Sequence, residues 1–166
     1  PKQTLRNRTV IMTSQGPKNL SIPVIRPFGA KTKMSEVKIS YVEDWRKTHW
    51  KSIESGYRSS PFFEFFEEEL KSFYEQKFEY LIELNEASQK MIYSWLQLEF
   101  PITIEKIGEI EVLDKKIADK NSEGNYQTKE YWQVFRDHIP FVGNVSILDL
   151  IFCEGNVSMN ILKKSN

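Results

Sequence analysis

Arg6 and Arg8 stand two residues apart in a β-branched segment near the start of the chain. Residues two apart on a β-strand face the same side, so the two guanidinium groups would lie together. Paired guanidinium groups can hold a diphosphate through forked hydrogen bonds. The neighbouring Lys2 and Gln3 could add further donors to such a site. An ordinary solvated strand face has the same spacing, so the sequence leaves both interpretations open.

A second group of candidate residues surrounds His49. The pKa of a histidine side chain is normally close to neutrality, so His49 could take a proton from a substrate. Trp45 and Trp50 flank it, and with Tyr57 they could form the walls of a sugar pocket. The alternative, which a single histidine on an amphipathic helix favours, is that these side chains pack between helices.

Polar residues in two other places complete the candidates. Ser60 precedes Pro61, and the pair is typical of a helix start, whose free amide groups could bind an anion. Gln133 is grouped with Asp149, which could serve as a base. However, Ser146 and Asp149 match a capping box, so a structural role is favoured for that pair.

Several classes of chemistry lack their sequence motifs. There is no glycine-rich phosphate loop, dinucleotide fingerprint or nucleophile elbow. His49 and His138 are far apart and Cys153 is the only cysteine, so we expect no metal, no cofactor and no internal disulfide. Cys153 lies in an apolar run, which favours a small buried side chain over a nucleophile.

The charge distribution points to an anionic partner. The 166-residue chain has zero net charge, yet eight basic residues in the first forty oppose only Glu36, while residues 61–85 are strongly acidic. A basic end suits a sugar nucleotide or another anionic small molecule, and a solvated basic sheet edge explains it equally well. We expect no nucleic-acid binding, since no such motif is present. No apolar run approaches the ~18 residues of a membrane span. The single cysteine suits the reducing cytoplasm.

Hydrophobic patterning predicts a β-rich start. Residues 5–12 and 20–25 read as the two strands of a hairpin around the Gly16–Pro17 turn. Pro23 cannot donate to a sheet ladder, so the second strand should lie at an edge there. A short third strand is expected at 37–39.

The remainder predicts mainly helices. A capping box at Ser40 and Glu43 indicates a helix over 41–59. The Ser60–Pro61 pair indicates the start of a second helix. Apolar residues at three- and four-residue steps predict a central core helix over 78–98. The C-terminal part predicts an extended aromatic segment at 131–135 and short helices over 146–155 and 157–163.

These elements predict one α+β domain, majority helical, with a small antiparallel sheet in the N-terminal third packed on four to five helices. Within residues 1–166 we expect a β-rich part at 1–40 and a helical part at 41–100. A mobile loop is expected at 105–130, where the sequence is charged and weakly patterned.

Four blocks of the sequence together resemble the WbqC-like family of bacterial proteins, which is associated with surface-polysaccharide gene clusters. They are residues 1–8, 45–57, 60–66, and 133–135 with 144–152. The blocks follow the family's order and cover nearly the whole chain. The resemblance implies a single WbqC-like domain that lacks the family's N-terminal segment.

The resemblance also implies a function, namely a transferase of O-antigen or other surface-polysaccharide biosynthesis. It would move an aminoacyl group, such as glycyl, onto a nucleotide-linked amino sugar. On this hypothesis Arg6 and Arg8 hold the diphosphate and His49 accepts the proton of the attacking amine. The alternative is a non-catalytic module that binds a glycan or sugar nucleotide with the same residues. The sequence leaves the oligomeric state open.

Overall fold

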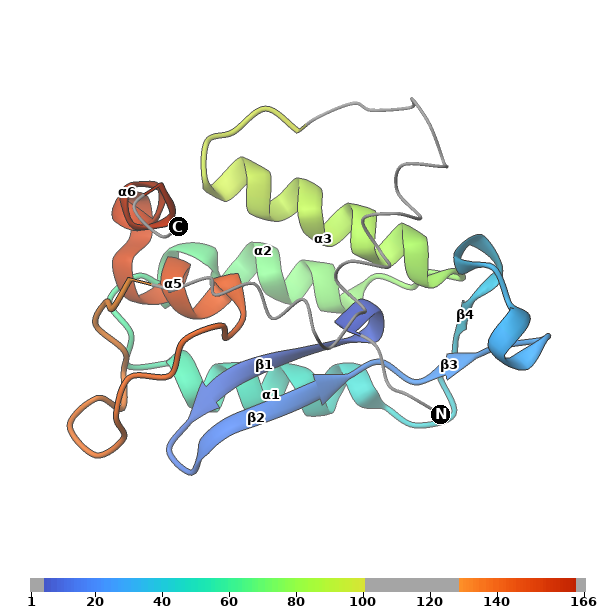
Figure 1. Cartoon of the computed structure of the whole chain (residues 1–166), viewed down its shortest axis with the longest axis horizontal. Coiled ribbons are helices and arrows are strands. Elements are labelled where there is room, and N and C mark those ends of the chain that lie inside the picture. Colours follow the sequence, from blue (N-terminus) through green and yellow to red (C-terminus); the bar gives the residue numbers. More distant parts are fainter. Residues whose placement is uncertain (1–4, 101–128, 164–166) are drawn as a thin grey trace.

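The computed structural model describes residues 5–100 and 129–163, which form an α+β fold (Figure 1). The strands are β1 (Arg8–Thr13), β2 (Gly16–Ser21), β3 (Val24–Ile25) and β4 (Lys38–Ile39). The helices are α1 (Trp45–Tyr57), α2 (Phe63–Glu75), α3 (Leu81–Trp95), α5 (Ile147–Glu154) and α6 (Ser158–Leu162). Short 3₁₀ turns lie before β1, between β3 and β4, and between α5 and α6. The predicted class, a small N-terminal antiparallel sheet on a mainly helical body, is confirmed. The predicted loop at 105–130 lies almost wholly outside the described residues.

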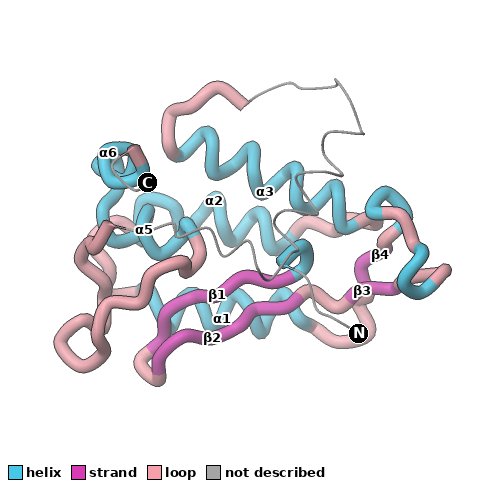
Figure 2. The backbone as a smooth tube through the Cα atoms, viewed as in Figure 1, coloured by secondary structure: helices cyan, strands magenta, loops and turns pink. Residues whose placement is uncertain are grey.

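The strands form two separate two-stranded antiparallel sheets (Figure 2). In the first, β1 pairs with β2 from Arg8–Ser21 to Thr13–Gly16. In the second, β3 pairs with β4. The prediction of one continuous strand over 20–25 is therefore wrong. Pro23 has no N–H group to give to a ladder, and its carbonyl instead accepts a hydrogen bond from Ser40 N at 2.8 Å.

Helix α1 begins later than the sequence pattern predicted. Its N-cap is Asp44, whose side chain accepts a hydrogen bond from Lys47 N at 3.4 Å. The predicted capping box at Ser40 is wrong, and the Ser40 carbonyl accepts from Trp45 Nε1 at 3.1 Å. Aspartate is as good an N-cap as serine, so capping preference alone could not decide between the two.

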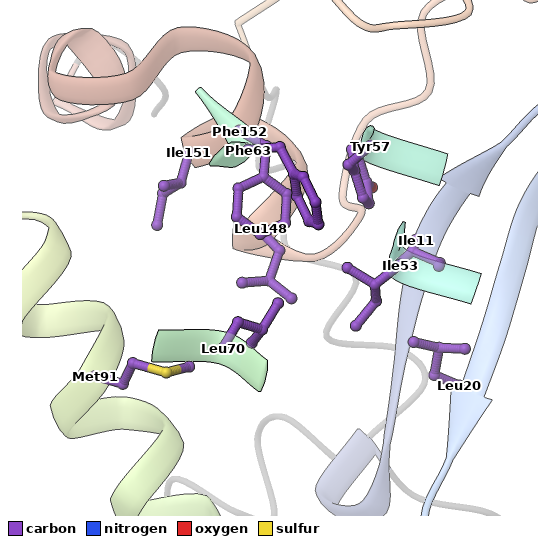
Figure 3. Close-up of a cluster of buried hydrophobic side chains, with 10 residues drawn as sticks. All are labelled: Ile11, Leu20, Ile53, Tyr57, Phe63, Leu70, Met91, Leu148, Ile151 and Phe152. Atoms are coloured by element: carbon purple, nitrogen blue, oxygen red, sulfur yellow. The ribbon is translucent and has the colours of Figure 1, made fainter. Parts of the chain in front are cut away.

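The main core lies between the hairpin, α1, α2 and α5, with α3 covering α2 on its outer side (Figure 1). Figure 3 shows its ten buried residues, which come from six elements: Ile11, Leu20, Ile53, Tyr57, Phe63, Leu70, Met91, Leu148, Ile151 and Phe152. Helix α3 was predicted as the central helix. Its buried positions are only Leu81, Leu84 and Met91, whereas α1 buries six.

The C-terminal part was predicted well at its helix, and before the helix the structure has the predicted extended segment only in part. Helix α5 has Ser146 as N-cap, whose Oγ accepts from Leu148 N at 3.3 Å, and it ends at Gly155 with a φ of 55°. Residues 131–135 form no strand; they run extended and then turn. The amide of Gln133 bonds both N and O of Val142, which replaces a sheet ladder.

Gly56 sets how closely α1 approaches β1. A methyl group built on Gly56 would stand 2.7 Å from the Met12 carbonyl oxygen. Alanine normally stabilises a helix by about 1 kcal/mol over glycine. We expect Gly56→Ala to destabilise the fold instead, by about 1–3 kcal/mol, because the strand must move away.

Urea denaturation measures this effect. Ser55→Ala on the exposed side of the same helix is the control and should change the free energy of unfolding by no more than about 0.5 kcal/mol. A Gly56→Ala variant as stable as the parent would contradict the close approach.

Candidate functional site

A pocket of about 230 Å³ lies between the start of β1, helices α2 and α3, and the start of α5. We call it the His49 pocket. Arg6 and Arg8 line it from the entry to β1, and His49 lines it from α1. Helix α3 contributes the polar side chains of Asn85 and Ser88. The described lining thus combines cations, neutral polar groups and an apolar floor, a mixture suited to a small polar ligand.

The two arginines reach this pocket by different routes. Arg8 is the first residue of β1, whereas Arg6 lies in a 3₁₀ turn before the strand. Their placement therefore depends on the turn as well as on strand alternation. Asn85 Nδ2 donates to the Arg6 carbonyl at 3.2 Å, which ties this turn to α3. Lys2 and Gln3 lie outside the described residues.

His49 is buried, with 6% of its surface exposed. Its Nε2 lies 3.1 Å from the Ser21 carbonyl oxygen in β2. A carbonyl only accepts hydrogen bonds, so Nε2 carries the hydrogen and Nδ1 is the acceptor of the neutral ring. Burial lowers the His49 pKa to about 4; the Ser21 bond opposes this shift and the charge of Lys18 adds to it. The side chain is therefore neutral at pH 7.

The two tryptophans are not brought to the pocket. Trp45 is buried in a second apolar cluster, and its ring meets His49 edge-on with centroids 5.1 Å apart. Trp50 is half-buried and packs against Phe63, 6.4 Å between centroids. Neither is in the described lining. Both contacts match the packing alternative that the sequence left open.

Tyr57 and Gln133 instead meet at Asp149, which is fully buried. Tyr57 Oη donates to Asp149 Oδ1 at 2.8 Å. Tyr131 Oη and Gln133 Nε2 donate to Oδ2 at 2.7 and 2.8 Å. Met12 N in turn donates to Tyr57 Oη at 3.0 Å. We call these four side chains the Asp149 network, and burial raises the pKa of both tyrosines above its usual value.

The Asp149 network differs from what the sequence pattern predicted. Ser146 caps α5 as expected, but Asp149 is not its capping partner, because the carboxylate points into the network. The sequence did contain a signal for this network: Asp149 lies inside the apolar run 147–153. A carboxylate buried in such a run needs hydrogen-bond donors that are also buried.

Ser60 does not open a helix. Helix α2 begins at Phe63, and Ser60 Oγ is buried and donates to the Tyr57 carbonyl at 2.7 Å. The Phe62 amide is also engaged, since it donates to the Phe152 carbonyl at 3.0 Å. The predicted helix start at Ser60–Pro61 is therefore wrong, since α2 begins at Phe63, and anion binding by amides at this end of α2 stays a prediction.

The polar residues that helices α2 and α3 contribute to the pocket were not among the sequence candidates: Tyr74, Asn85 and Ser88. Tyr74 comes from α2, and burial raises its pKa above the usual value. Asn85 and Ser88 stand three residues apart on α3, and Ile92 follows on the same face. Two polar residues on the otherwise apolar face of this helix were the feature of the sequence from which they could have been predicted.

Cys153 is buried, and its burial raises the pKa of the thiol, as expected for a structural side chain. Within residues 5–100 and 129–163, no cluster of His, Cys, Asp and Glu could hold a metal ion. In those same residues no helix has both the length and the apolar character that crossing a membrane requires.

The chain belongs to the WbqC-like protein family, whose family model matches residues 1–123. The match includes the hairpin, α1, α2 and α3, and hence Arg6, Arg8 and His49. It ends before α5 and Asp149. Comparisons with curated proteins and with solved structures found no match. Family membership points to a polysaccharide-associated protein.

The lowered pKa of His49 predicts a pH-dependent stability. Between pH 6.5 and about 4 the unfolded state binds a proton that the folded state excludes. The contribution of His49 to the free energy of unfolding is therefore highest above pH 6.5 and decreases as the pH falls toward 4, by up to about 3 kcal/mol in total. Urea denaturation at pH 7.5 and 4.5 should show that the parent loses about 2 kcal/mol more than His49→Gln. Equal losses would contradict the buried neutral histidine.

The Asp149 network predicts a large stability loss when its charge is removed. In Asp149→Asn the charge is removed and one carboxylate oxygen becomes an NH₂ group, so at least one of the three buried donors loses its acceptor, at a cost of about 2–3 kcal/mol. Glu154→Gln is the control on the same helix. The side-chain oxygen of the new glutamine can still accept the hydrogen bond from Trp132 N, so the thermal unfolding temperature should change little. Equal shifts for both variants would contradict the role of the network.

Proposed function

We propose that the protein is a transferase of bacterial O-antigen or surface-polysaccharide biosynthesis that moves an acyl or aminoacyl group onto a nucleotide-linked amino sugar. The observation that carries this proposal is that Arg6, Arg8 and His49 line one pocket. Family membership supports the polysaccharide context. The proposal includes a cytoplasmic location, which suits a chain whose single cysteine, Cys153, is unpaired.

The size of the pocket suggests how such a ligand would lie. A volume of about 230 Å³ is small for a complete nucleotide sugar but accommodates one sugar ring. Arg6 is exposed and Arg8 is half-buried. The sugar would therefore enter the pocket toward His49, and the diphosphate would remain at the arginine end. Guanidinium groups suit this task because they bind phosphate oxygens in pairs.

The proposed step joins the sugar amine to an activated ester or thioester. The amine nitrogen attacks the carbonyl carbon, a C–N bond forms, and the C–O or C–S bond to the leaving group breaks. His49 Nδ1 takes the proton from the nitrogen and returns it to the leaving group. The bond from Nε2 to Ser21 holds the ring in the tautomer that this step requires.

One observation favours the second candidate, a binding module without catalysis. A general base works best when its pKa is near the operating pH, and the His49 pKa is lowered to about 4. In a binding module, Nδ1 would accept a hydrogen bond from a sugar hydroxyl or amine. Arg6 and Arg8 would bind the diphosphate end of the ligand, as they would in the transferase.

His49→Gln separates the two candidates. Glutamine keeps hydrogen-bonding capacity but cannot take the proton, so turnover should fall by ~10²–10⁴ while binding changes only a few fold. The assay mixes the protein with UDP-glucosamine and a panel of aminoacyl esters and thioesters, and follows the mass gain of the sugar. Binding is measured by calorimetry.

Trp50→Phe is the control because Trp50 is also on α1 but outside the described lining. It should leave binding and turnover close to those of the parent. Unchanged turnover in His49→Gln would contradict the role of His49. A parent that binds UDP-glucosamine but modifies it with no donor would support the binding module.

A further inference from the structure

A second concave surface lies at the other end of the hairpin. It is an open groove of about 690 Å³ between residues 13–19 and the residues Lys51, Ser52 and Ser55 of α1. We call it the hairpin groove. β1 packs directly on α1 in this region, which fixes the two walls relative to each other (Figure 1).

The hairpin groove is cationic. Lys18 and Lys51 line it, and its described lining contains no carboxylate. Glu54, the acidic neighbour of these residues on α1, is bonded to Arg58 at 2.6 Å, so its charge is already compensated. The two ammonium groups therefore face the groove without a competing anion in its described lining.

Hydroxyl groups arrange the cationic wall. Lys18 Nζ donates to Ser52 Oγ at 2.8 Å, and Ser52 Oγ donates to the Thr48 carbonyl at 2.8 Å. This chain fixes the Lys18 ammonium against α1 and uses only one of its three N–H groups. Ser14 and Ser55 supply further hydroxyl groups to the lining.

The chemistry of this lining selects a class of ligand. Ammonium and hydroxyl groups together recognise phosphate oxygens, and the described lining supplies both kinds of group. The volume exceeds one phosphate and falls within the usual range for small-molecule sites. A diphosphate-bearing small molecule fits both the charge and the size.

We propose that the hairpin groove binds the diphosphate group of a second, small-molecule substrate. This inference rests on the proposed function in one respect, which is that the second substrate is the activated acyl donor. The His49 pocket is filled by a single sugar ring, so a two-substrate transfer needs a separate site for the donor. Ser52, which holds Lys18, stands three residues after His49 on α1, so one face of this helix contributes to both sites.

Calorimetry with inorganic pyrophosphate and with ADP tests the groove independently of any transfer. We expect both to bind the parent. In an Arg6→Gln/Arg8→Gln background, which removes the proposed diphosphate end of the His49 pocket, Lys18→Gln/Lys51→Gln should weaken each at least 10-fold. Lys47→Gln removes the same charge from α1, one turn from Lys51 and outside the described lining. It should change either affinity by less than about 3-fold, since an exposed charge outside the contact contributes little.

Circular dichroism of each variant shows whether the fold is intact, and Lys51→Gln alone provides a second variant that leaves the Lys18–Ser52 bond in place. No pyrophosphate binding to the parent would overturn the proposal, as would equal losses in Lys47→Gln and Lys51→Gln. Pyrophosphate binding that depends on Lys18 and Lys51, in a protein that transfers no acyl group, would support the groove and contradict only the transferase.

Discussion

The buried carboxylate of Asp149 is the constraint on which much of this structure depends. A fully buried charge is costly unless its hydrogen bonds are satisfied, and three neutral donors satisfy this one. The donors come from α1 and from the segment at 131–133, and Tyr57 extends the network to β1 through Met12 N. One aspartate thus fixes four segments that are distant in the sequence.

The His49 pocket depends on that anchoring. Helix α5 contributes Ser146 and Leu148 to its wall, and Ser146 N donates to the Val10 carbonyl of β1 at 2.6 Å. A displacement of α5 would open this wall. The His49 ring is held separately, through Ser21 in β2. The network and the pocket therefore share the strand β1 but use different side chains for different tasks.

The sequence predicted local structure better than long-range contacts. Helix α5 was correct because its cap and its terminal glycine are adjacent signals. The predicted strand over 5–12 begins only at Arg8, so the same-face argument for Arg6 and Arg8 was wrong: Arg6 lies in a 3₁₀ turn. Gln133 was grouped with Asp149, 16 residues away, but the contact of Tyr57 with Asp149 was missed, because 92 residues separate them. No periodicity encodes such a contact, and only burial in the folded chain reveals it.

The proposed binding of a nucleotide-linked sugar in the His49 pocket can be measured by hydrogen–deuterium exchange of the full chain with and without UDP-glucosamine. If the sugar binds there, exchange should slow in the peptides that cover residues 6–9 and 85–92, because both segments line the pocket. Unchanged exchange in both segments at a saturating ligand concentration, or protection confined to other parts of the chain, would contradict it.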